Sequence, residues 1–121
     1  MRKSYVSFVW SVAMSLPGTK ETTTFGTKSF RVGEKPYARM HDDDATLVLK
    51  IDAETRQKLI QDKPDFYYIT ESYTNFPLML VRLDQIDEAE LRDVLELAWR
   101  SDASPELIAQ YVAGSDKAPL Q

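Results

Sequence analysis

Residues 28–40 read KSFRVGEKPYARM, and this stretch decides the fold. Short segments of β-forming residues on either side of a Gly-Glu pair are typical of two antiparallel strands joined by a two-residue turn. The pattern predicts strands at residues 28–32 and 35–40. In that register Phe30 faces Tyr37 across the hairpin, which is a favourable aromatic pair. The hairpin therefore predicts a mainly antiparallel sheet.

Further elements follow on both sides of this hairpin. β-Branched and aromatic residues predict strands at residues 22–25, 46–51, 66–69 and 77–83. Helical spacing and capping residues predict helices at residues 4–16 and 53–61, a third capped by Asp87, and a fourth that Pro105 opens and Gly114 ends. Short connections indicate antiparallel pairing with the helices on one face. We expect an α+β fold with the element order α-β-β-β-α-β-β-α-α.

The length of 121 residues predicts one domain, which we place at residues 1–114, followed by a flexible C-terminal tail at residues 115–121. The chain has no cysteine, which excludes disulfides, thiol nucleophiles and thiolate zinc sites and fits a reducing compartment. Serines interrupt the apolar stretch near the N-terminus, and no run approaches the roughly 20 apolar residues of a membrane span. We expect a cytoplasmic bacterial protein that does not contact a membrane.

Catalytic motifs do not occur in the sequence. The single histidine, His41, precedes three aspartates, and the four glycines form neither a phosphate-binding loop nor a dinucleotide fingerprint. The segment 41–44 has two interpretations, a weak divalent-cation site or a solvated turn. The glycine and the distal glutamate of an EF-hand are missing, which favours the turn. We therefore expect no enzyme activity, no cofactor and no metal.

The charge is unevenly distributed along the chain. The net charge of −4 does not favour nucleic acid as a ligand of the whole molecule. Residues 28–39, however, hold four cations against one acid, and residues 84–106 hold eight acids against two arginines. The aromatic residues between 67 and 76 could stack on nucleobases or fill the core. Both interpretations stay open from the sequence.

Several segments resemble the MmcQ/YjbR family in order and content. They are SLPG at 15–18, FGTKSFRVGEKPYAR at 25–39, LVLKID at 47–52, FYYIT at 66–70 with Tyr73, LVRL at 80–83, and LAWR at 97–100 with Ala103. The resemblance spans residues 8–113. It implies a frataxin-like (CyaY-like) fold and a DNA-binding domain of the double-wing type. Ser72 and Leu78 stand where many relatives carry histidine and tryptophan.

Two functions follow as hypotheses. The first is binding of nucleic acid, with DNA as the expected ligand, through the basic hairpin and the sheet face. Lysine and arginine would contact the phosphates. Its candidate residues are Lys28, Arg31, Lys35, Arg39, Lys50, Tyr73 and Arg82. The alternative is a protein-interaction or small-ligand module that could bind a second copy of itself. The basic hairpin would then meet acidic helices, and Trp10 at the edge of the apolar first helix would support the contact.

Overall fold

The computed structural model describes residues 5–116. Its elements in chain order are α1 (Val6–Ala13), β1 (Thr19–Thr24), β2 (Thr27–Val32), β3 (Lys35–Met40), β4 (Thr46–Lys50), α2 (Ala53–Asp62), β5 (Tyr67–Tyr68), the 3-10 helix η1 (Glu71–Tyr73), β6 (Leu78–Arg82), α3 (Glu88–Asp102) and α4 (Pro105–Asp116). Ser4, the predicted start of the first helix, and residues 117–121 of the predicted tail lie outside the described residues. The α+β class is confirmed.

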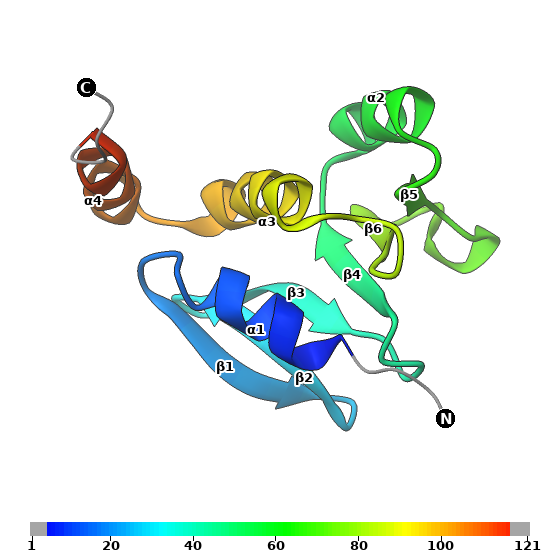
Figure 1. Cartoon of the computed structure of the whole chain (residues 1–121), viewed down its shortest axis with the longest axis horizontal. Coiled ribbons are helices and arrows are strands. Elements are labelled where there is room, and N and C mark those ends of the chain that lie inside the picture. The colour runs from blue at the N-terminus through cyan, green and yellow to red at the C-terminus, as the bar shows by residue number, and fades with distance from the viewer. Residues whose placement is uncertain (1–4, 117–121) are drawn as a thin grey trace.

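The strands form one antiparallel sheet in the order β1-β2-β3-β4-β6-β5. The first four strands are joined by short turns and run as a meander, which Figure 1 shows as a curved layer below the helices. The strand β6 then pairs with β4, and the short β5 lies at the edge. Four strands precede α2, one more than the predicted element order counts, although all four segments were predicted.

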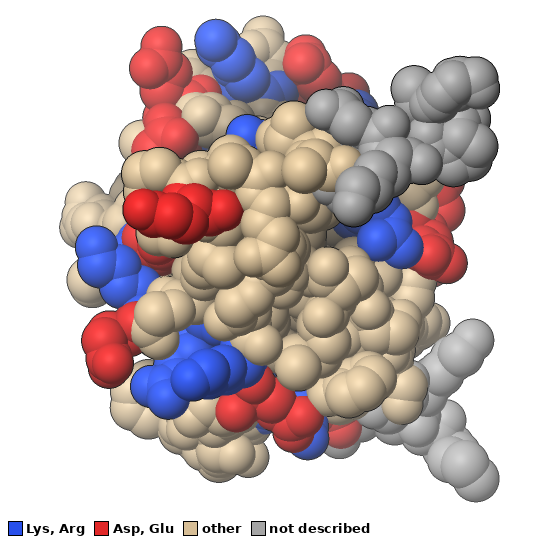
Figure 2. Space-filling view, turned by 90° about the vertical axis from the view of Figure 1, so that its left-hand side faces the viewer, with Lys and Arg blue, Asp and Glu red and all other residues tan. Residues whose placement is uncertain are grey.

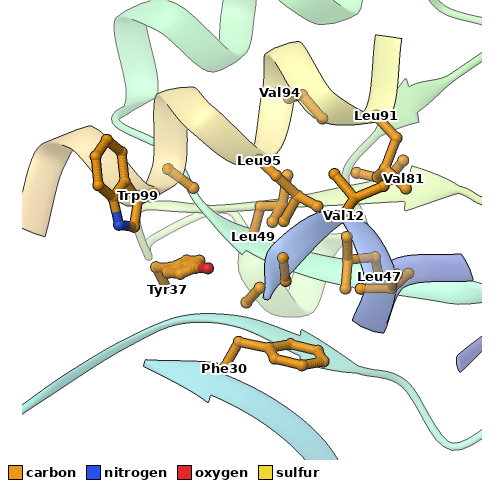
Figure 3. Packing of buried hydrophobic residues seen from close by; sticks show 14 of the residues in the cluster. Val12, Phe30, Tyr37, Leu47, Leu49, Val81, Leu91, Val94, Leu95 and Trp99 are labelled. Atoms are coloured by element: carbon orange, nitrogen blue, oxygen red, sulfur yellow. The ribbon is translucent and has the colours of Figure 1, made fainter. Parts of the chain in front are cut away.

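One face of the sheet packs under the helices, as predicted. Phe30, Leu47, Leu49 and Val81 point from the strands toward α3, where Figure 3 shows them below the helix. From the helices, Val12 of α1 and Leu91, Val94, Leu95 and Trp99 of α3 complete this buried cluster. Each of these side chains is at most 1% exposed. Burial of this many large apolar side chains is the main source of stability in a domain of this size.

The predicted pairing of Phe30 with Tyr37 is wrong. Phe30 lies opposite Ala38, because the register of β2 and β3 shifts between Phe30 and Arg31. Such a bulge places two residues of one strand against one residue of the other. Pro36 lies within this part of β3 and has no backbone N–H for a regular ladder. Tyr37 is buried instead beside Trp99, as Figure 3 shows, and its hydroxyl is 2.8 Å from Oγ1 of Thr19.

Two predicted helix boundaries also differ. The helix α1 ends at Ala13 rather than residue 16, although Leu16 in the following turn is still buried. The helix α4 continues through Gly114 to Asp116, so that glycine does not end it. Both differences arise because contacts and not single residues set where a helix stops.

Two polar contacts tie α3 to distant parts of the chain. Nε1 of Trp99 donates to the carbonyl oxygen of Pro17 at 2.9 Å, which fixes the connection between α1 and β1. Glu90, at the other end of α3, accepts from Nζ of Lys63 at 2.8 Å and from the hydroxyl of Tyr67. Burial, together with this bond to Glu90, raises the pKa of Tyr67 well above its usual value. The hydroxyl therefore stays protonated and continues to donate.

Replacement of Trp99 by alanine should lower the free energy of unfolding by about 3–5 kcal/mol, because it removes a fully buried ring and leaves a cavity. Leu97→Ala on the same helix is the matched control, since Leu97 is 44% exposed, and it should change stability by less than about 1 kcal/mol. Urea denaturation followed by circular dichroism measures both. Similar losses for the two variants would contradict this packing.

Candidate functional site

The sheet face opposite the helices, called here the open face, carries the side chains that point away from the core. Residues paired directly across antiparallel strands point to the same side. Ser29 pairs with Arg39, Arg39 with Val48, and Val48 with Leu80. These residues alternate with the core residues Phe30, Leu47 and Leu49. The open face is therefore mixed, with apolar residues at its centre and an arginine beside them.

A hollow of about 340 Å³ lies on the open face. Ala38, Val48 and Leu78 belong to its apolar lining, and Ser29 also faces it. Two aromatic side chains from different turns take part in the lining: Phe25 from the turn between β1 and β2, and Phe76 from the segment before β6. They are 87% and 57% exposed. We call this space the sheet hollow.

The sheet hollow also has a cationic side. Arg39 lines it, and its guanidinium carbon lies 5.8 Å from the ring centroid of Phe25. Arg31 is two residues from Ser29 on the same face of β2 and pairs directly with Lys20 of β1. Lys20 is exposed, and Arg31 is half-buried with an Nε that has no hydrogen-bond partner among the described atoms. Three cations therefore lie along β1, β2 and β3 on the open face.

The sequence-predicted cations divide into two groups. Lys28 points to the helix side, where it pairs with Glu21, and Nζ of Lys50 pairs with Asp102 at 3.1 Å. Arg31 and Arg39 share the open face, where Arg31 lies only 4.0 Å from the exposed Glu34. Lys35 is exposed at the hairpin end. The structure therefore brings together Arg31 and Arg39 and neutralises Lys28 and Lys50 with carboxylates.

Arg82 is on the open face, because its partner Thr46 is two residues from Val48, but neither Arg82 nor Tyr73 lines the sheet hollow. The guanidinium carbon of Arg82 stacks 4.0 Å from the centroid of the Tyr68 ring. Both residues line a second, polar hollow of about 560 Å³, together with Asp43, Asp65 and Asp84. These carboxylates oppose anion binding near Arg82. Tyr73 is half-buried in η1 and does not line the sheet hollow.

Sequence reasoning missed the contribution of Lys20 and of Phe25. The predicted first strand begins at residue 22 and so leaves Lys20 out, whereas β1 begins at Thr19. The same predicted strand ends with Phe25, whereas Phe25 forms a tight turn with Gly26. The dipeptide Phe-Gly between two short polar strands was the available signal, since two-residue turns often end in glycine.

Figure 2 shows the side of the molecule on which α4 lies in Figure 1. Lysine and arginine side chains alternate there with aspartate and glutamate around a broad uncharged area. Mixed signs at this spacing largely cancel beyond about 10 Å at ordinary salt. Within residues 5–116, the charges visible on this side form no extended basic field for nucleic acid.

The segment at residues 41–44 forms a turn. Within residues 5–116, no three His, Cys, Asp or Glu side chains are placed to hold a metal ion. Asp43 instead accepts from the backbone N–H groups of Ala45 and Thr46, both at 2.9 Å, and from the Thr46 hydroxyl. Partial burial alone would raise the pKa of Asp43, but these hydrogen bonds and His41 together lower it. No helix in the described part of the chain is long and apolar enough to cross a bilayer.

Asp43→Asn should lower the melting temperature at pH 7, because the charged acceptor of three hydrogen bonds is lost. A lowered folded-state pKa stabilises the fold above the unfolded value near 4 and stops doing so as the pH falls through the folded-state pKa. The difference between Asp43→Asn and the unmodified chain should therefore shrink as the pH falls below the unfolded value near 4. Thermal melts at pH 7 and at a series of lower pH values test this. Asp65→Asn, at an exposed position, is the control, and a difference that persists in acid would contradict the assignment.

A comparison with family models identifies the family of this chain. The YjbR family model matches residues 14–101. The chain is 33% identical over 57 residues to the uncharacterized proteins Mb2600 of Mycobacterium bovis and Rv2570 of Mycobacterium tuberculosis. That alignment covers 47% of this chain and 44% of each relative, so it spans less than half of their length.

A solved structure shares the fold. The crystal structure of Deinococcus radiodurans protein DR2400, with the family-model domain DUF419, superposes with a TM-score of 0.64 and 25% sequence identity. The match covers 81% of this chain and 79% of that protein. This structural match and the family model, which covers most of the domain, support the family and its fold. The frataxin likeness and DNA binding stay predictions. The chain belongs to the YjbR family.

Proposed function

We propose that this domain is a cytoplasmic, non-catalytic module that binds single-stranded DNA on the open face of its sheet. One observation carries the proposal: Lys20, Arg31 and Arg39 share this face with the exposed aromatic rings of Phe25 and Phe76. Proteins that bind single strands combine cations that follow the phosphates with aromatic rings on which the bases stack.

The shape of the open face favours a single strand over a duplex. Duplex DNA is usually recognised by a helix or a two-stranded ribbon that enters the major groove, where its side chains contact the base edges. The described helices pack their apolar residues toward the core, on the other face of the sheet. Their outer surface includes the exposed Glu88 in the first turn of α3. A single strand, in contrast, exposes its bases to a sheet surface.

The same geometry predicts weak and salt-dependent binding. Lys28 and Lys50 form ion pairs with Glu21 and Asp102, so they contribute little to the binding of a phosphate. Lys20, Arg31 and Arg39 are the open-face cations on β1, β2 and β3, and each phosphate contact in a single strand contributes a slope of about −0.7 to the dependence of log K on log salt. A total slope of about −2 is expected.

The absence of catalysis is part of the proposal. Tyr37 borders the sheet hollow, but its ring is buried beside Trp99, and burial raises its pKa to about 12, although its hydrogen bond with Thr19 opposes the shift. A phenol with that pKa is almost fully protonated at neutral pH and is a poor general base. The cations in the lining are Arg39 and Lys50. Their charged side chains are hydrogen-bond donors only and cannot act as a general base.

A second candidate function is a protein-interaction module, and Trp10 favours it. Its ring is 44% exposed on α1, and its Nε1 donates to Glu21 at 2.8 Å. Exposed tryptophans are frequent at the centre of protein interfaces. Sedimentation at low and high salt tests self-association, and a monomer under both conditions would remove that form of the alternative.

The double variant Arg31→Glu with Arg39→Glu should weaken binding of a labelled 12-nucleotide single strand at least tenfold at low salt. The reason is that it replaces two of the three cations that β1, β2 and β3 place on the open face with acids. Fluorescence anisotropy at several salt concentrations measures the affinity and its slope.

The matched control is Lys58→Glu with Arg100→Glu, which changes the net charge equally at two exposed helix positions. It should retain affinity within about threefold, because long-range charge effects are screened. Equal losses in the two double variants would show that net charge and not the open face governs binding. No binding by the unmodified chain would remove the proposal.

A further inference from the structure

The turn at Phe25 and Gly26 holds an aromatic residue in a backbone conformation that it disfavours. The φ angles are 52° at Phe25 and 79° at Gly26. A two-residue hairpin turn with both φ values positive is type I′, which prefers asparagine or aspartate followed by glycine. A bulky residue at positive φ is an outlier, and such outliers concentrate at functional sites.

Packing within the domain does not explain this residue. Phe25 is 87% exposed, so its ring gains little from burial. Its described ring contact is with the guanidinium of Arg39, at 5.8 Å from the centroid. An exposed cation–π contact at this distance is weak. The residue is thus unfavourable for the backbone and adds little to the core.

The position of Phe25 matches a stacking role. It lines the sheet hollow together with Phe76, which approaches from the segment before β6 and is 57% exposed. The same lining includes the apolar side chains of Val48 and Leu78. A flat ring could enter this space and leave an attached phosphate near Arg39. The charge at the rim is complementary to that phosphate, because Arg39 and the neighbouring Arg31 and Lys20 are cations.

We infer that Phe25 is a base-stacking residue, and that the sheet hollow takes one nucleobase of a single strand while Arg39 contacts the adjoining phosphate. This inference rests on the proposed function and specifies how the open face holds its ligand. Stacking uses the π face that every base has, so the hollow accepts different bases with similar affinity. Binding of inorganic phosphate or of a sugar-phosphate strand without bases is correspondingly weak.

Phe25→Asn is the decisive variant, because it should have two opposite effects. Asparagine suits the first position of a type I′ turn, so the melting temperature should rise or stay unchanged. Loss of the ring should weaken binding of a 12-nucleotide single strand roughly 5- to 150-fold, the range expected for one stacked base. Phe25→Trp should restore most of the affinity. Leu97→Asn, at an exposed apolar position on α3, is the control and should leave the affinity unchanged.

A strand of equal length with abasic sites separates the inference from the proposed function. If the inference holds, the unmodified chain binds the abasic strand more weakly, and Phe25→Asn binds both strands alike. If the unmodified chain binds both strands equally and Phe25→Asn matches it, phosphate binding stands and the stacking role is overturned. If neither strand binds, the proposed function and the inference both fail.

Discussion

The packing of α3 against one face of the sheet is the constraint on which the other features depend. Leu49, Leu95 and Trp99 are fully buried between these two layers. Because side chains alternate along a strand, burial of one set fixes the direction of the set between them. Arg39 and Val48 point to the open face for this reason. The core thus determines the candidate site, although it contains none of the residues proposed to contact the ligand.

The same packing selects which cations remain available. The end of α3 places Asp102, whose side chain is only 4% exposed, within 3.1 Å of Lys50. Glu21 is directed to the helix side by its pairing with Phe30, and there it meets Lys28 and Trp10. A carboxylate partner cancels most of the field that a lysine would offer to a phosphate. The positive character of the open face therefore comes from cations such as Lys20, Arg31 and Arg39, which in the described part of the chain have no buried carboxylate partner.

Local patterns predicted the architecture because they depend on neighbours in the sequence. The hairpin at 28–40, the capped helices and the sheet with helices on one face follow from periodicity and turn residues. The pairing of Phe30 failed because a bulge next to Pro36 shifted the register. The partners of Lys28 and Lys50 lie 7 and 52 residues away, so charge counts along the chain could not reveal them. Phe25 and Phe76 are far apart in the sequence, and only the tertiary fold brings them to the same hollow.

Most residues in a natural protein prefer the backbone conformation that the fold gives them, so a residue that does not is informative. Gly33 has a positive φ where the β2–β3 turn requires it, and Asp52 and Asp87 cap their helices through backbone N–H groups. Phe25 departs from this pattern, since it combines a positive φ with an exposed ring. A residue type that is unfavourable at its backbone conformation and adds no core packing is not explained by the stability of the fold. Its place beside Arg39 at the sheet hollow supplies one, because a ligand with a flat ring and a negative charge would contact both side chains.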